Sequence, residues 1–156
     1  MRIRSASDVF DLLGAHVSSA VLGSALELGL FWRLAEKPMT AMEIASAFDI
    51  PLFRCRYWLE ILKDLDLLQT EGDVYLPSEV ATKAILSTVS RDTWHNIANE
   101  SRDSYPCLAD LPVYIHEPGS ALAAQGVEFK HYFLQMKDNA DRARRFTRML
   151  FDPVSY

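Results

Sequence analysis

The sequence predicts a mainly α-helical domain that carries one short β-hairpin. Apolar residues recur at helical spacing through most of the 156 residues. Only one short stretch, 67–76, changes to the alternating pattern of strands around a glycine-containing loop. Hydrophobic residues make up 49% of the chain and charged residues 24%, which is ordinary for a single globular domain. The composition therefore excludes a disordered or low-complexity protein.

The first predicted helix is rich in small residues. We expect Ser7 to cap it, with Asp8 in the first turn, and Gly29 to mark a break after it. Small residues dominate between Gly14 and Ala25 and would allow another helix to approach closely, either within the domain or across a dimer. Our candidates for a dimer interface on this helix are Phe10, Leu13, Val17, Ala20, Val21 and Ser24.

The middle of the chain has the element order of a winged helix. We expect a turn at Lys37-Pro38-Met39, and Thr40 and Glu43 have the spacing of a capping box for the helix that follows. Pro51 ends that helix and starts the next, which carries Cys55, Leu59 and Leu62 on one stripe. The hairpin comes after it, and Ser78 is placed to cap a further helix that extends to about Leu86.

The last third of the sequence predicts helices with several breaks. Pro106 and Pro112 are expected to interrupt the chain around a short helix that holds Leu108, Leu111 and Ile115, and a turn is expected at 117–119. An apolar run follows at 126–136. Residues 139–151 then form a basic amphipathic pattern with arginines around an apolar face.

Four segments in this order resemble a known family. Residues 25–31 (ALELGLF) and 39–45 (MTAMEIA) are similar to two of its signatures, and 59–78 is similar to its winged hairpin. A late run of glycines and aromatics between Gly119 and Phe146 is similar to its final segment. Together they resemble the N-terminal half of the small-molecule O-methyltransferases of plant phenolic and bacterial polyketide or carotenoid type. Four positions depart from the pattern: Asp66, Leu108, Thr147 and Leu150.

The resemblance implies how the chain is organised. Residues 1–156 would be one dimerisation domain, with a core at 7–90, a hairpin at 67–76 and a helical extension at 91–156. The extension would lead to a Rossmann-like domain that is missing from this chain. In the family that missing half binds S-adenosylmethionine (SAM) and supplies the histidine general base, and the six glycines here are never spaced as G-x-G.

The same resemblance implies which parts this chain supplies. We expect no catalytic and no cofactor-binding residue. Its partner would be a second copy, or a chain that carries the Rossmann-like domain. In the family, the helix after residue 90 and the last helix before the catalytic domain help to wall the substrate pocket. Candidates for the wall facing a flat aromatic substrate are Trp94, His95, Phe146, Met149 and Leu150.

Other kinds of site are disfavoured by the residues themselves. The histidines (His16, His95, His116 and His131) lack the spacing of metal ligands on one helix, and Cys55 and Cys107 stand far apart in sequence. Two dispersed cysteines favour reduced thiols and a cytoplasmic protein. The apolar stretch 12–32 is interrupted by His16, Glu27 and serines, which argues against a membrane span.

Two alternative functions remain open at this stage. One is a winged-helix regulator that binds DNA through residues 51–66. A net charge of −5 argues against it, as do Arg54 and Arg56, which lie on different sides of the helix. The other is a non-catalytic scaffold that binds a small molecule, which the sequence scarcely separates from a methyltransferase subunit.

Overall fold

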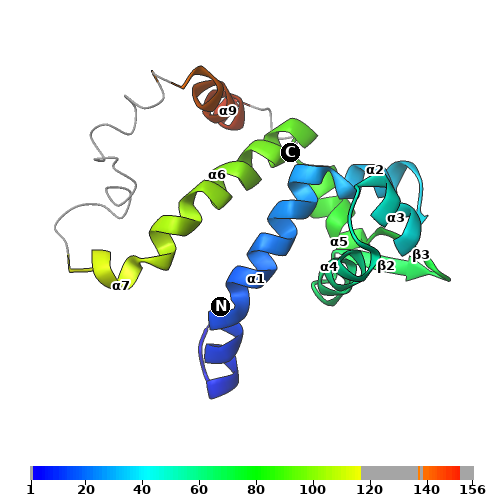
Figure 1. Cartoon of the computed structure of the whole chain (residues 1–156), viewed down its shortest axis with the longest axis horizontal. Helices are drawn as coiled ribbons and strands as arrows, with labels where there is room; N and C mark the ends of the chain where they lie inside the picture. Colours follow the sequence, from blue (N-terminus) through cyan, green and yellow to red (C-terminus); the bar gives the residue numbers. More distant parts are fainter. Residues whose placement is uncertain (1, 117–136, 138, 152–156) are drawn as a thin grey trace.

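The computed structural model describes residues 2–116, 137 and 139–151. In this part most residues are helical, which confirms the predicted fold class (Figure 1). The helices are α1 (Ala6–Leu28), α2 (Leu30–Glu36), α3 (Ala41–Ala47), α4 (Leu52–Asp64), α5 (Glu79–Ala81), a π-helical turn η1 (Thr82–Leu86), α6 (Arg91–Ala109), α7 (Leu111–Tyr114) and α9 (Ala140–Phe151). The expected turn at 117–119, the apolar run at 126–136 and His131 lie outside the described residues.

A small antiparallel sheet stands beside the helices. Strand β3 (Val74–Pro77) lies between β1 (Met39–Thr40) and β2 (Leu68–Glu71). The β2–β3 hairpin pairs Glu71 with Val74 around the predicted loop, so the wing is confirmed. The prediction of a hairpin alone was incomplete, because Met39 pairs with Tyr75 and adds a third strand where a turn was expected. Two residues are too few to produce an alternating pattern.

The hydrophobic core forms where α1 ends and the winged helix begins. Leu30, Phe31 and Leu34 of α2 are fully or almost fully buried, as are Leu59 and Leu62 of α4. Ile44 of α3 and Leu68 of β2 close the same cluster. The predicted capping box at the start of α3 is present: the Thr40 hydroxyl accepts the Glu43 N–H, and the Glu43 carboxylate accepts the Thr40 N–H. This core fixes the direction in which α1 leaves the domain.

The start of α1 differs from the prediction by two residues. Ser5, not Ser7, caps the helix: its hydroxyl accepts the Asp8 N–H, and the Asp8 carboxylate accepts the Ser5 N–H at 2.8 Å. The prediction was wrong because Asp8 closes a reciprocal box only with the residue three positions before it. The pKa of Asp8 is lowered, first by the hydrogen bond from the Arg4 N–H. At the other end Gly29 has φ +73°, which confirms the predicted break.

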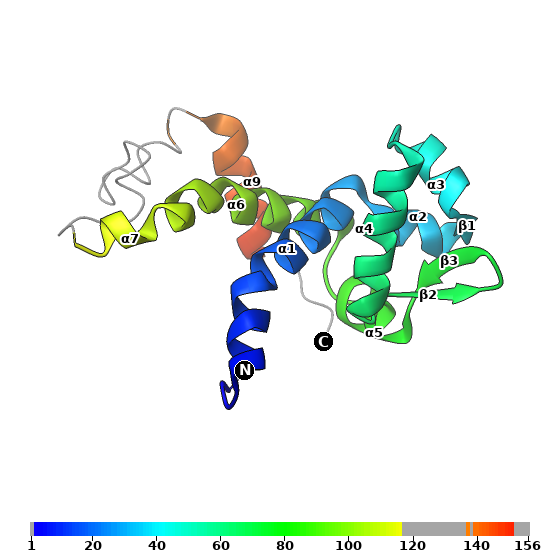
Figure 2. The ribbon, with the colours of Figure 1, turned by 60° about the horizontal axis from the view of Figure 1, so that its bottom comes forward.

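Helix α6 is longer than the prolines suggested. It continues through Pro106 to Ala109, so the prediction of a break at Pro106 was wrong, and Leu108 belongs to α6 while Leu111 starts the short helix α7. A proline removes one backbone hydrogen bond, and an otherwise strong helix can absorb that loss with a kink. Helices α1 and α6 lie against each other near the winged helix and diverge away from it, and α9 packs on α6 (Figures 1 and 2).

Candidate dimerisation surface and groove

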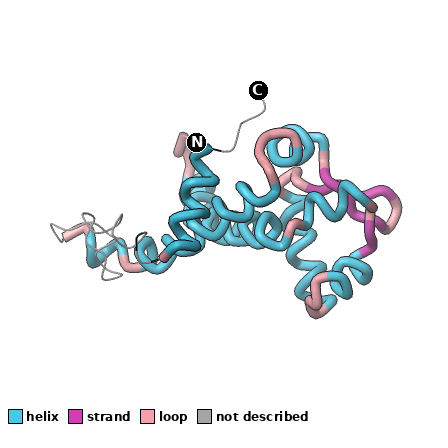
Figure 3. Tube along the Cα trace, turned by 90° about the horizontal axis from the view of Figure 1, so that it is seen from above, coloured by secondary structure: helices cyan, strands magenta, loops and turns pink. Residues whose placement is uncertain are grey.

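Helix α1 has two halves with different surroundings. Near its C-terminal end Ala25 and Leu26 are buried, and the Trp58 indole N–H donates to the Val21 carbonyl at 3.1 Å. Its N-terminal half extends away from the winged helix (Figures 2 and 3). There Phe10 is 73% exposed and Leu13 is 68% exposed. A helix that exposes large apolar side chains outside its own core has the character of an interaction surface.

The six residues proposed for the dimer interface separate along this helix. Phe10, Leu13, Val17 and Ala20 are exposed. Val21 is partly buried and packs against the domain core. Ser24 is partly buried too, and its hydroxyl donates to the Val21 carbonyl at 2.8 Å. The first four are therefore available to a second chain, whereas Val21 is packed against this domain's own core.

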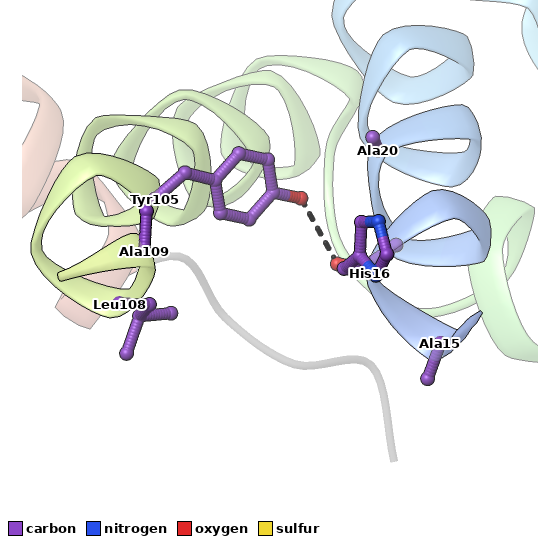
Figure 4. A pocket seen from close by; sticks show the side chains of 7 residues that line it. Ala15, His16, Ala20, Tyr105, Leu108 and Ala109 are labelled. Atoms are coloured by element: carbon purple, nitrogen blue, oxygen red, sulfur yellow. Dashed lines mark hydrogen bonds between the residues drawn. The ribbon is translucent and has the colours of Figure 1, made fainter. Parts of the chain in front are cut away.

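A groove of about 600 Å³ runs between α1 and α6. Its lining is mainly apolar and consists of Ala15, His16, Ser19, Ala20, Tyr105, Leu108 and Ala109 (Figure 4). The hydroxyls of Ser19 and Tyr105 lie 3.0 Å apart and join the two helices. His16 Nδ1 lies 2.8 Å from the Leu13 carbonyl of its own helix. A concave apolar surface with a few polar groups suits an apolar side chain or an aromatic ligand.

The sequence predicted only one side of this groove. The small residues of α1 indicated a close approach by another helix. Helix α6 does approach α1, and the Ser19 and Tyr105 hydroxyls meet at 3.0 Å, but small side chains such as Ala15 and Ala20 leave a groove beside that contact. No periodic pattern points to Tyr105 or Ala109, since residues 91–104 are mostly polar. Leu108 departs from the family pattern, and no signal in the sequence places it on the groove.

Polar contacts hold α6 against the end of α1. Arg102 Nη1 lies 2.6 Å from Glu27 Oε2, and a second nitrogen donates to the Asn99 side-chain oxygen at 2.6 Å. His95 Nδ1 lies 3.0 Å from the Glu27 carbonyl. With the Glu27 side chain only 20% exposed, the pair is better shielded from solvent than an ordinary surface ion pair. These contacts set the angle at which the groove opens.

The candidates for a substrate-pocket wall fall on α6 and α9, which pack together. Trp94 is half-buried against the domain core, and its indole N–H donates to the Ile85 carbonyl at 3.0 Å. His95 is exposed and contacts α1 as above. On α9 Phe146 is half-buried and Leu150 is 59% exposed. The side chain of Met149 lies outside the described part.

The described residues give no support to a metal site or a reactive thiol. Among them, no group of three or more His, Cys, Asp or Glu side chains could hold a metal ion. Cys55 is buried, and burial raises the pKa of its thiol. A thiol with a raised pKa is a poor nucleophile, so Cys55 acts as a core residue.

Helix α4, the position of a recognition helix in DNA-binding winged helices, does not present a basic face. Its exposed residues include the apolar Phe53 and Tyr57. Lys63 is paired with Glu60 at 2.5 Å, and the guanidinium of Arg54 lies over the Phe53 ring. Duplex binding needs several free cations on one surface. This helix is therefore a poor match to the DNA-binding alternative.

Helix α1 is also long and apolar enough to cross a membrane, by length and composition alone. Core helices of soluble proteins and N-terminal signal sequences have the same properties, so the finding is weak. The hydrogen bond from Trp58 to Val21 and the buried Ala25 show that its C-terminal part belongs to the domain core.

The fold and the exposed helix define a winged-helix domain of the dimerisation class. A family model for the O-methyltransferase dimerisation domain matches residues 10–87. The chain belongs to this family, which confirms the resemblance. The N,N-dimethyltransferase OxyT of Streptomyces rimosus is 31% identical over 147 residues.

Solved structures show the same fold. PigF with SAH has a TM-score of 0.78 at 19% identity and covers 95% of this chain. Human N-acetylserotonin methyltransferase in complex with SAM has a TM-score of 0.74 at 23% identity and covers 96%. The dimethyltransferase RosA of Streptomyces davawensis has a TM-score of 0.69 at 19% identity and covers 94%. The chain spans less than half of these proteins: 41% of OxyT, 44% of PigF and 45% of the human enzyme.

Proposed function

We propose that this chain is the dimerisation and pocket-wall module of a SAM-dependent small-molecule methyltransferase, and that it does not transfer methyl groups by itself. The observation that carries the proposal is the match over 95% of this chain to 44% of PigF, a protein whose structure contains SAH. SAM would be bound by a Rossmann-like domain, on the same polypeptide or on a partner chain.

Self-association follows from the family and from the shape of α1. The exposed residues Phe10, Leu13 and Val17 recur on one face of the helix, and Ala20 continues that face into the groove. Two copies that exchange these faces would bury apolar surface that is otherwise in contact with water. A homodimer built on α1 is therefore the assembly we propose, with cytoplasmic localisation.

The acceptor atom is set by the catalytic half rather than by this domain. The family carries the name of O-methyltransferases, and the resemblance favours a hydroxyl acceptor. OxyT and RosA, however, are named as dimethyltransferases, OxyT at nitrogen. The proposal is thus a small-molecule acceptor with an aromatic part, held partly by α6 and α9.

A chimera tests this function directly. Residues 1–156 would replace the matched segment of OxyT, which is 41% of that protein, and the purified chimera would be assayed for dimer formation and for SAM binding by calorimetry. We expect a dimer that binds SAM, whereas residues 1–156 alone bind none. Measurable SAM affinity of residues 1–156 alone, or a monomeric chimera with a folded catalytic half, would contradict the proposal.

A further inference from the structure

A second cavity, of about 270 Å³, lies between α6 and α9. It is lined by Asn96 of α6 and by four residues of α9, which are Asp141, Arg144, Arg145 and Arg148. The α9 residues are spaced i, i+3, i+4 and i+7, so they share one face of the helix. Three arginines on that face make the cavity cationic.

Ion pairs neutralise only part of this charge. Arg144 is paired with Asp141 at 2.5 Å, and Arg145 lies 4.0 Å from Glu100, which also pairs with Arg142 at 3.3 Å. The distance to Glu100 is too long for a hydrogen bond, and Arg145 Nε and Glu100 Oε1 are both buried without a hydrogen-bond partner among the described residues.

The guanidinium of Arg148 supplies hydrogen-bond donors to the cavity. Within the described ranges, Arg148 forms no ion pair. Asp92, one helical turn before Asn96 on α6, forms none either, so it does not neutralise Arg148 at contact distance. The cavity therefore has a guanidinium available for an anion.

Asn96 is the second and independent indication of a ligand. It is only 5% exposed, yet its side-chain amide makes no hydrogen bond to any described residue. An amide placed in this way beside guanidinium groups is suited to donate to an oxygen atom that enters the cavity.

We propose that this cavity binds the carboxylate of a small aromatic acid, with Arg148 and Asn96 as its donors. A guanidinium matches the two oxygens of a carboxylate, and the amide can supply a further hydrogen bond. The volume falls below the ~300–1,000 Å³ of sites that enclose a whole drug-sized ligand, so it fits an acidic group better than an entire substrate. Together with the proposed function, which places α6 and α9 in the pocket wall, this makes the methyl acceptor an aromatic acid.

Side-chain NMR of the isotopically labelled 156-residue chain tests the binding step. Sodium benzoate and benzamide, which have nearly the same shape but differ in charge, would be titrated separately. Benzoate is expected to shift the signals of the Asn96 amide and the arginine Nε–H groups of α9. Benzamide is expected to bind at least about tenfold more weakly, because it cannot form charge-assisted hydrogen bonds to arginine.

Variants locate the site. Arg148→Gln should weaken benzoate binding about tenfold, and Arg148→Lys should weaken it less because the charge remains. Arg56→Gln, on the exposed side of α4, is the matched control and should leave the affinity unchanged. Arg148 is exposed, so its replacement leaves the core intact, and circular dichroism would verify the fold of each variant.

Several results would overturn the proposal. These are no benzoate binding at tens of millimolar, equal binding of benzamide, an unchanged affinity in Arg148→Gln, or shifts confined to other parts of the chain. Inorganic phosphate that binds as tightly as benzoate at the same signals would show a general anion site instead. None of these readouts depends on dimer formation or on SAM, so failure here is distinguishable from failure of the proposed function.

Discussion

The guanidinium of Arg91 fills the space beside Gly29 in which any other residue would place its Cβ. Gly29 has φ +73° and ends α1, and its N–H donates to the Leu26 carbonyl at 3.2 Å. Arg91 starts α6, and its Nη2 donates to the Leu28 carbonyl at 3.5 Å. The end of α1 and the start of α6 therefore meet at a position that favours glycine, because φ is positive and a Cβ would have to displace the Arg91 guanidinium.

Gly29→Ala should destabilise the domain by about 1–2 kcal/mol, because an L-residue with a side chain resists a left-handed backbone. Urea unfolding measures the change. In an Arg91→Ala background the clash with the guanidinium is absent, so the cost of Gly29→Ala should be smaller there. An equal cost in both backgrounds would show that the backbone alone accounts for it, and no cost in either would contradict the described conformation.

Asp66 also adopts a left-handed conformation, with φ +55°. It stands where the resemblance places a glycine in the family pattern, and glycine is the residue that adopts this conformation most readily. We expect Asp66→Gly to be more stable than Asp66→Ala by about 1–2 kcal/mol in urea unfolding. Equal stabilities of the two variants would mean that the turn is not left-handed in solution.

The Thr40 capping box makes stability depend on pH. The backbone N–H of Thr40, followed by its hydroxyl and by Lys37, holds the pKa of Glu43 below its ordinary value of 4.5. A depressed folded-state pKa contributes stability that is present above pH 4.5 and is lost as the pH falls through the folded value.

Thr40→Ala should therefore cost about 1 kcal/mol at neutral pH. The difference from the wild type should shrink as the pH falls below 4.5. Ser46→Ala, exposed on the same helix, is the control and should change little. Thermal unfolding across the pH range measures both, and a pH-independent difference for Thr40→Ala would contradict the role of the carboxylate.

Local patterns carried most of the fold prediction. The sequence correctly predicted the capping box of Thr40 and Glu43, the end of α1 at Gly29 and the helix cap at Ser78. Capping and chain reversal depend on a few adjacent residues, so local sequence is enough to predict them. The strand at Met39 and the helix through Pro106 were not predicted, since the first exists only by pairing with a distant strand and the second only because tertiary context tolerates the proline.

The candidate surface was predicted in part. The periodicity of α1 placed Phe10, Leu13 and Val17 on one face, but it could not show that Val21 packs against the domain's own core. That distinction depends on the Trp58 indole, which comes from a helix 37 positions further along the chain.

Leu13→Glu tests whether the exposed face of α1 forms the dimer. A buried carboxylate at an apolar interface should weaken association at least about tenfold while the helical content stays the same, because Leu13 lies outside the core. Phe53→Glu, which changes an equally exposed apolar residue on α4, is the matched control and should not affect association. Loss of the dimer in the control but not in Leu13→Glu would move the interface to the other face of the domain.

The oligomeric state of the purified 156-residue chain tests the central claim most directly. Multi-angle light scattering across the micromolar range should give twice the mass of one chain, with dissociation only on dilution. A clean monomer at high micromolar concentration would contradict the account, because the exposed apolar half of α1 would then have no second copy to cover it.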